Sequence, residues 1–344
     1  MTKNRRGRFL LCLAICWGCA LPFSCLLGPV SISPPEVFQA LWAKLGLADS
    51  PMNEASFLVV GDIRLARVVI AAFCGGALAV AGVTLQGVLR NPLADPFTLG
   101  ISAGAACGAS LVITLGEMAA PAAMLGLTRA GLIAPAALAG ALLALFMAIW
   151  LGSAGTSLRR ENVVLAGIAV SAFLGALVAL IKALHEESVT SIVFWLLGSL
   201  QGRSWENLSL LLVTFVPGFI LVVFNFRKLD VLCLGDDEAS QLGLNVSWAR
   251  LCLLGGAGMM TAGCVAVTGI IAFVGLVVPH LLRLILGASH GPLLTGAFFG
   301  GGLLLVLADA LARCLPGGQE LPVGVVTALL GGPFFALLIR RRRC

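Results

Sequence analysis

The chain has 344 residues with 22 basic and 16 acidic side chains, so its formal net charge is +6. Only 11% of its residues are charged, 59% are hydrophobic and its mean hydropathy is +1.04, whereas soluble domains carry about 25% charged residues. This composition excludes a water-soluble globular domain and predicts an all-α polytopic membrane protein.

Apolar stretches long enough to cross a bilayer, which takes about 20 residues, follow one another along the chain. The first comes after four basic residues and lacks a clear cleavage site, so we expect an uncleaved span. Pro34-Pro35-Glu36 then begins a short amphipathic helix over 37–47, and residues 192–200 are apolar but too short to cross. The predicted spans, about ten in all and least distinct between the seventh and eighth, are 9–30, 64–89, 97–115, 130–151, 162–184, 208–226, 251–269, 270–286, 292–312 and 321–339.

The stretch 75–108 joins two of these spans through a short polar turn. Its helices are rich in glycine and alanine, and Pro92 and Pro96 break the turn, since proline lacks a backbone donor and disfavours helix in the preceding residue. Small residues let helices approach closely in lipid, where packing replaces the hydrophobic effect. We therefore predict a transmembrane hairpin, packed in the protein interior, with a rigid tip that carries Arg90.

Basic residues are concentrated on one side of the predicted spans. With the N-terminus inside, the cytoplasmic ends hold 15 of the 22 lysines and arginines, as the positive-inside rule requires. This distribution predicts an even number of spans with both termini in the cytoplasm. The opposite side holds Lys44, Arg64, Arg67, Arg129, Lys182, Arg203 and Arg313.

Sequence motifs for catalysis are missing. No lysine completes G-x-x-x-x-G-K-[ST], so the chain lacks a phosphate-binding loop, and HExxH and GxSxG are absent. Cys16 and Cys19 form a CxxC pattern, but they lie in a continuous apolar stretch without His, Asp or Glu within reach. We therefore predict that these two cysteines fill apolar space rather than bind a metal. The chain as a whole is predicted to be neither an enzyme nor a nucleic-acid-binding protein.

Asp309 is the candidate ionisable residue inside a span. It stands four residues before Arg313, a spacing that favours a structural ion pair over a proton relay. An ion-coupled secondary transporter keeps ionisable residues near mid-membrane, and the spans of this chain are nearly free of them. A pathway driven by a partner is therefore favoured over a stand-alone secondary transporter.

The longest polar stretch after the N-terminal third is 227–250. Three consecutive acidic residues in it favour the first turn of a short helix, which would stop at Gly243, and a second short helix would start at 244–246. Exposed leucines beside an acidic end fit a protein-docking surface, although composition alone fits an ordinary solvated loop equally well. The residues that would form this surface are Gly235, Asp236, Asp237, Glu238, Ala239, Leu242 and Gly243.

Four long motifs, in order along the chain, resemble the FecCD-type permease family. They are RNPLADPFTLGISAGAACGA, LDVLCLGDDEASQLGLNV, GIIAFVGLVVPHLLRLILG and ADALARCLPGGQELPVGVVTALLGGPFF, and the match runs from about residue 62 to the end. Members of this family are membrane subunits of ABC importers for iron-siderophores, haem and vitamin B12. The resemblance implies one transmembrane domain over 1–344, with the type II ABC importer permease fold and ten spans.

The resemblance also implies roles for particular residues. Residues 229–247, within 227–250, match the cytoplasmic loop that couples the permease to its ATPase, which favours docking over the ordinary loop. Asn91 and Leu93 match the cytoplasmic gate of the family. The arginines that fall where family members face acidic residues of the binding protein are Arg64, Arg67 and Arg313.

The assembly that the resemblance implies lies in the bacterial inner membrane. It contains two copies of the permease with the pathway between them, two ATPase subunits that use ATP and Mg, and a periplasmic or lipid-anchored binding protein. The chain itself would bind no cofactor. No motif distinguishes the substrate: an iron chelate, ferric siderophore or haem, is the first expectation and cobalamin the alternative. The stretches before residue 62 and over 117–127 match the family poorly and leave this detail open.

Overall fold

The structure is a computed structural model and describes residues 3–28, 30–47, 54–115, 129–153, 158–314 and 320–341. The poorly matching stretch 117–127 and the last basic residues, 342–343, lie outside this part. All regular structure in it is helical. The elements are α1 (Lys3–Leu26), α2 (Pro34–Lys44), α3 (Glu54–Phe57), the π-helix η1 (Leu58–Arg64), α4 (Leu65–Val88), the 3₁₀ helix η2 (Pro96–Leu99), α5 (Ile101–Leu115), α7 (Arg129–Gly152), α8 (Arg160–Leu184), the 3₁₀ helix η3 (Glu186–Ser188), α9 (Val189–Leu196), α10 (Trp205–Leu232), α11 (Asp236–Gln241), α12 (Val246–Thr268), α13 (Val274–Leu286), α14 (His290–Cys314) and α15 (Val323–Arg341).

The predicted spans are confirmed as helices. In the described part of the chain, seven helical stretches are long and apolar enough to cross a membrane, and three shorter apolar helices, α5, α13 and most of α15, accompany them. The seventh and eighth predicted spans are separated at residues 269–273, where Gly269 and Phe273 both have positive φ. The amphipathic helix predicted after the first span is α2, which begins with a capping box of Ser33 and Glu36.

Two predicted boundaries are wrong for the same reason. The segment before α4 is already helical from Glu54, through η1, and α10 continues to Leu232, so residues 227–232 are helix rather than loop. The second short helix expected at 244–246 is the first turn of the long α12. Hydropathy marks where a helix leaves the apolar layer, whereas the helix itself ends only where backbone hydrogen bonding stops.

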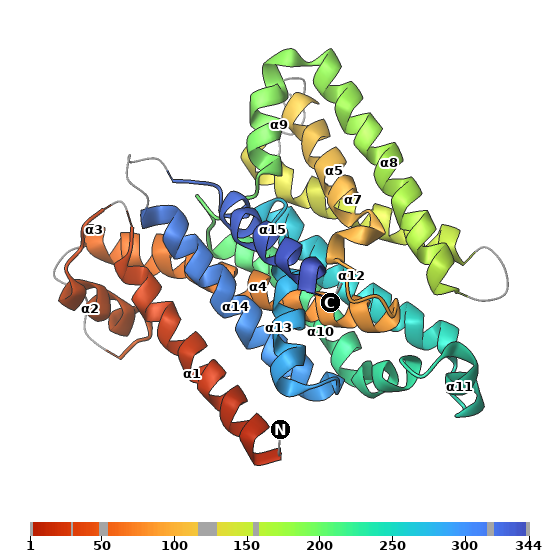
Figure 1. The fold of residues 1–344 in the computed structure, drawn as a ribbon. Helices are drawn as coiled ribbons and strands as arrows, with labels where there is room; N and C mark the ends of the chain where they lie inside the picture. The colour runs from red at the N-terminus through yellow and green to blue at the C-terminus, as the bar shows by residue number, and fades with distance from the viewer. Residues whose placement is uncertain are drawn as a thin grey trace.

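The two halves of the predicted hairpin pack against different partners. α4 is the central helix and contacts α10, α12, α13 and α14, whereas α5 packs against α7 and α8. Figure 1 shows α5, α7, α8 and α9 standing together in the upper part of the view, with α4 crossing below them. The prediction of an interior helix pair with a tight turn therefore holds for α4 and the turn, but the two helices diverge after it.

The small residues of these helices mark where backbones touch. A Cβ added at Gly75 would lie 2.2 Å from the carbonyl oxygen of Gly301, and one added at Gly301 would lie 2.2 Å from that of Gly75. Gly104 of α5 and Gly140 of α7 form a second reciprocal pair, with distances of 2.3 and 2.2 Å. Such contacts leave room only for hydrogen, which is how membrane helices gain packing energy.

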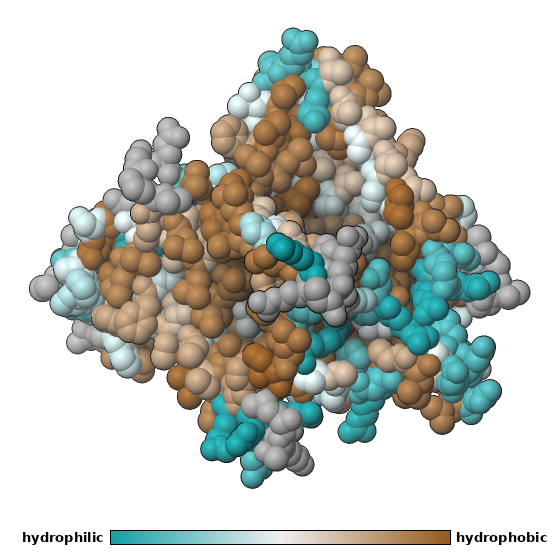
Figure 2. Space-filling model, viewed as in Figure 1, coloured by the Kyte–Doolittle hydropathy of each residue, from teal (hydrophilic) through white to brown (hydrophobic). Residues whose placement is uncertain are grey.

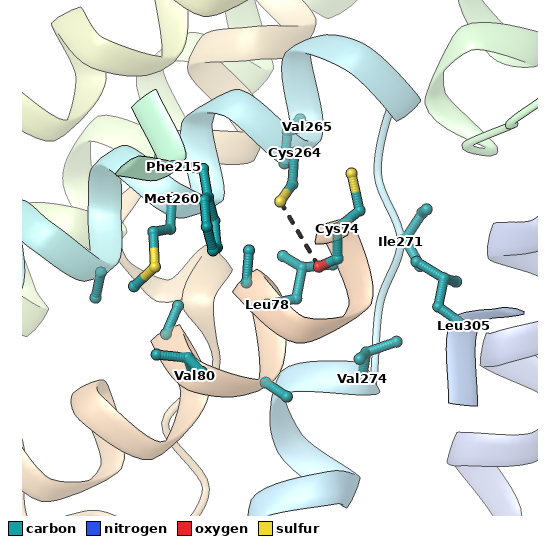
Figure 3. Close-up of a cluster of buried hydrophobic side chains, with 14 of the residues drawn as sticks. Cys74, Leu78, Val80, Phe215, Met260, Cys264, Val265, Ile271, Val274 and Leu305 are labelled. Carbon is teal, nitrogen blue, oxygen red and sulfur yellow. Dashed lines mark hydrogen bonds between the residues drawn. The ribbon is translucent and has the colours of Figure 1, made fainter. Parts of the chain in front are cut away.

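Between these crossings the core is filled by ordinary apolar side chains. Figure 3 shows Met260 and Cys264 of α12 next to Leu78 of α4, with Phe215 of α10 beside them. The Cys264 thiol donates to the carbonyl oxygen of Cys74 at 3.7 Å. These cysteines are fully buried and act as small core residues.

Candidate functional site

The short helix predicted in the polar loop is α11, and it ends as expected at Gly243. Gly243 has φ +81, its N–H donates to the carbonyl of Ser240, and the N–H of Leu244 donates to that of Ala239. This pair of bonds is a Schellman motif, which satisfies the last carbonyls of the helix. The chain then enters α12, which Asn245 caps by accepting from the N–H of Trp248 at 3.0 Å.

The side chains of α11 and its flanking residues differ in charge and in exposure. The three acidic residues occupy its first turn, where the helix dipole favours negative charge. Ala239 is buried against the protein, whereas Leu242 is 66% exposed and Leu234 is also exposed. Figure 2 shows hydrophilic side chains gathered over α11, in contrast to the brown apolar surface of the central helices. The loop therefore presents two leucines on a charged, ordered surface.

Arg250, the last residue of the polar stretch 227–250, bonds the first residue of α11. Arg250 is 1% exposed; its Nη2 donates to Oδ1 of Asp236 at 2.8 Å, and its Nη1 donates to the carbonyl oxygen of Leu158. The N–H of Leu158 donates in turn to Oγ of Ser247 at 3.3 Å. The signal in the sequence was a basic residue one turn inside an apolar helix, where an unpaired charge is unfavourable.

A groove runs beside α11, with a volume of about 1050 Å³. The first turn of α12, the start of α8 and Arg90 from the turn after α4 also line it. Arg160 and Glu161 form an exposed pair at its edge, at 2.6 Å. The groove thus carries both signs of charge. Its lining includes residues of the α10–α12 connection and Arg90 of the α4–α5 turn, so these two connections lie at the same end of the molecule.

The predicted gate residues lie in a tight turn over residues 90–95, here called the gate turn. Arg90 has φ +48, and Oδ1 of Asn91 accepts from the N–H of Leu93 at 2.9 Å. Asn91 and Leu93 are exposed, Leu93 by 43%. Asp95 accepts from the N–H of Phe97 at 2.9 Å and so caps η2. Side chains of Asn91 and Asp95 thus satisfy backbone N–H groups of the turn; its rigidity and the gating role of Asn91 and Leu93 stay predictions.

Two polar contacts that the sequence did not predict join the helices next to the gate turn. Nη1 of Arg283 donates to Oε1 of Gln86 at 2.5 Å, which joins α13 to the last turn of α4. Nδ1 of His290 lies 2.6 Å from Oδ1 of Asp230, which joins α14 to α10. Pairs so far apart in the chain give no signal in a single sequence.

Asp309 is at the centre of a charge cluster at the opposite end of α4. It is fully buried and accepts from Nε and Nη2 of Arg67 at 3.0 and 2.8 Å, while Arg313 lies 3.1 Å away. Nη1 of Arg67 also donates to Oε2 of Glu320 at 2.6 Å. The predicted Asp309–Arg313 ion pair is therefore confirmed and is part of a larger cluster with Arg67.

The other two arginines predicted to dock the binding protein also have acceptors within the chain. Arg64 donates to the carbonyl oxygens of Cys25 and Val30, and Arg313 donates to Oγ of Ser24 at 2.7 Å. All three arginines are buried in the single chain. Arg64 and Arg67 therefore have different neighbours within the chain, because Arg64 bonds the end of α1 and Arg67 bonds α14. Their part in docking stays a prediction.

Comparison with known proteins places this architecture in a family. Residues 12–341 match the FecCD transport family. The chain belongs to this family. The hemin transport system permease HmuU of Yersinia pestis is 39% identical over 92% of this chain and 90% of its own length. The vitamin B12 import system permease BtuC of Escherichia coli O9:H4 is 36% identical over 99% of this chain and 98% of its own.

A solved structure agrees with the fold of this FecCD-family chain. A transporter of the metal-chelate ABC type, in an inward-facing conformation, superposes with a TM-score of 0.81 at 29% identity, covering 97% of this chain and 99% of the other. The chain is therefore a multi-pass permease of an ABC importer, a transport subunit rather than an enzyme. The all-α permease fold is confirmed, with seven helical stretches long enough to span and three shorter apolar helices among the described residues.

Proposed function

We propose that this FecCD-family permease carries an iron chelate, a ferric siderophore or haem, from the periplasm to the cytoplasm, driven by an ATPase bound at α11. The observation that carries the proposal is α11 itself. This six-residue helix is capped at its end and bonded at Asp236, and exposed Leu234 and Leu242 flank it on either side. Burial of these leucines by a partner would remove apolar surface from water, which favours association.

The proposed assembly contains two copies of the chain, two ATPase subunits that use ATP and Mg, and a periplasmic or lipid-anchored binding protein. It lies in the inner membrane with both termini in the cytoplasm, which the distribution of basic residues supports. The side of α8 that carries Leu165, Ile168 and Phe173 is apolar and exposed in the single chain, so a second copy or lipid must cover it. The chain binds no cofactor of its own in this proposal.

Cobalamin is the alternative substrate. Similarity to the vitamin B12 permease, which aligns with nearly the whole chain, favours cobalamin. Similarity to the hemin permease, with a slightly higher sequence identity, favours haem. These ligands are large and rigid, so a wide path with weak contacts suits either of them and leaves little trace in the sequence.

Transport by the reconstituted complex tests the proposal. The permease, its ATPase and its binding protein are placed in proteoliposomes with ATP inside the lumen or outside, and uptake of ferric siderophore, haem and cobalamin is measured separately. ATP-dependent accumulation of an iron chelate, with cobalamin at the level of ATP-free vesicles, is the expected result. Accumulation of cobalamin alone would establish the alternative substrate, and transport of neither class would reject the proposal.

A further inference from the structure

We propose that Arg250 is a positioning residue which transmits movement of α11 to α8, and through α8 to the gate turn. This inference deepens the proposed function and rests on it, since it assumes that an ATPase binds α11. Three contacts in series carry it: Arg250 with Asp236, Arg250 with Leu158, and α8 with η2.

The first contact is a charge pair between the helix that meets the ATPase and a helix that spans the membrane. Asp236 is the first residue of α11 and its side chain is 41% exposed, whereas the side chain of Arg250 is buried in α12. Their 2.8 Å bond joins an oppositely charged donor and acceptor, which is the stronger class of hydrogen bond. α11 is only six residues long, so a pull on its first residue displaces the whole helix.

The second contact ties the same guanidinium to the start of α8. Leu158 is buried, two residues before α8 begins at Arg160. Its carbonyl oxygen accepts from Nη1 of Arg250, and its N–H donates to Ser247. Both backbone polar groups of Leu158 are therefore held by α12, and one of the two bonds comes from the residue that holds Asp236.

The third contact carries the movement along α8 to the gate turn. A Cβ added at Gly167 of α8 would lie 2.3 Å from the carbonyl oxygen of Thr98, within η2. One added at Gly100, which has φ +80, would lie 3.1 Å from Cγ1 of Val170. Backbones this close cannot slide independently, because interiors are close-packed. η2 is capped by Asp95, two residues after Leu93, so displacement of α8 displaces the gate turn.

Arginine suits this position because its planar guanidinium serves two acceptors in different directions. Nη1 and Nη2 bond the backbone of one segment and the carboxylate of another. A lysine ammonium on a flexible stem lacks this fixed fork. Arg250→Lys is therefore expected to keep the charge and lose the link, which separates geometry from electrostatics.

The test measures coupling apart from folding and assembly. The variants are Arg250→Met, Arg250→Lys, Asp236→Ala and Asp236→Asn, with Arg8→Met, an exposed arginine on α1, as the matched control. In the complete complex, ATP hydrolysed per substrate transported is measured in proteoliposomes. In nanodiscs, a Leu93→Cys probe is labelled by a polar maleimide with and without ATP, relative to the same protein without the probe. Co-purification of the ATPase reports assembly.

Arg250→Met, Arg250→Lys and Asp236→Ala are expected to assemble and hydrolyse ATP, with at least about a fivefold higher ATP cost per substrate, the lower end of typical coupling between sites. Their ATP-dependent change in Leu93→Cys labelling should be lost. Asp236→Asn keeps an acceptor oxygen and should retain most of both. The double variant Arg250→Met, Asp236→Ala should hydrolyse little more ATP per substrate than either single variant, because both changes break the same bond.

A normal ATP cost and a normal labelling change in Arg250→Met would overturn the inference. If that variant does not assemble, Asp236→Ala decides, since the Asp236 side chain is 41% exposed and Arg250 keeps its bond to Leu158 without it: normal coupling in it overturns the inference, and lost coupling rescued in Asp236→Asn supports it. A wild-type complex that transports nothing would reject the proposed function instead.

Discussion

Single charged residues behave very differently in this protein according to where they lie. Lys44 and Asp62 form an ion pair at 2.5 Å in which both side chains are partly exposed. Asp309 is fully buried between two arginines. An exposed pair gains little because water competes for both partners, whereas removing one member of a buried set leaves uncompensated charge. The same type of pair is therefore dispensable in one place and essential in the other.

Asp309→Asn is expected to destabilise the permease by about 3–5 kcal/mol, the usual cost of breaking a buried ion pair. The measurement is the thermal unfolding midpoint in detergent. Asp62→Asn is the matched control, with an expected loss below about 1 kcal/mol. Equal midpoints for the two variants would show that the Asp309 cluster contributes no more than a surface pair.

Asp95, in the turn between α4 and α5 outside the spans, makes stability depend on pH. Burial raises the pKa of its carboxyl to about 6, against an ordinary value of 3.8, although the hydrogen bond from Phe97 works in the opposite direction. Below both values the carboxyl is protonated in the folded and unfolded states. Between them only the unfolded state has ionised, so the folded protein loses stability as pH rises, and above about 6 the penalty is complete.

Asp95→Asn keeps the cap of η2 and removes this penalty. The unfolding midpoint of the variant is expected to exceed that of the wild type by an amount that grows from pH 4 to pH 6 and then levels off. Asp95→Ala, the control, also loses the cap, which costs about 1 kcal/mol. A difference between Asn variant and wild type that is constant over this range would contradict the raised pKa.

At the scale of elements, α11 shows how a marginal helix becomes a surface that a partner can use. Six residues are too few for an isolated helix in water. Three contacts with the rest of the chain stabilise this short helix instead: the Schellman motif at Gly243, the burial of Ala239 and the hydrogen bond from Arg250. What remains exposed is the pair of leucines, whose burial by a partner releases water without further ordering of the chain.

Leu242→Asp is expected to abolish co-purification of the ATPase and the hydrolysis that the binding protein stimulates, while the permease itself stays folded. Gly243→Pro should act in the same way, because proline cannot adopt φ +81. Leu45→Asp is the control, at a leucine that is equally exposed, 69%, after α2. Wild-type stimulation in the Leu242 variant would show that α11 does not carry the interface.

Helix crossings make a second prediction at this scale. Gly75→Ala would place a methyl group 2.2 Å from the carbonyl of Gly301, so α4 and α14 must separate, at a cost of about 1–3 kcal/mol or more for an overpacked core. Gly18→Ala, where nothing lies within 4 Å, should be neutral or slightly stabilising. Unfolding midpoints of the two variants in detergent check this, and a tolerated Gly75→Ala would mean that the crossing can open freely.

At the scale of the whole molecule, the interior offers little to an ion gradient. Among the described residues, the fully buried carboxylate of Asp309 is already paired with two arginines, and Asp62, Glu161 and Asp230 lie near the ends of their helices. A transporter coupled to protons needs a group that can release and bind them within the path. This supports the proposal that a partner bound at α11 drives transport.

Uptake by the assembled complex is accordingly expected to continue after a protonophore collapses the proton gradient and to stop when ATP is depleted. The measurement is substrate accumulation in proteoliposomes under each condition, with membrane potential recorded by a dye as the control that the gradient is gone. Loss of uptake with the protonophore alone, at constant ATP, would favour a stand-alone secondary transporter.

The sequence by itself determined the class of protein, the number and order of the spans and the position of α11. Each of these depends on local information: apolar length, glycine and proline positions, and a run of acids before a glycine. The ion pair of Asp309 and Arg313 was predictable for the same reason, since one helical turn separates them.

Only the tertiary structure decided which helices meet and which charges pair across them. α4 and α5 share a turn yet pack on different neighbours, because close approach depends on complementary glycines at 140 and 301, far along the chain. Arg67 finds Asp309 across 242 residues, and Arg250 joins Asp236 to Leu158. A single sequence carries no signal for such pairs, since their energy arises only when the fold brings desolvated donors and acceptors together.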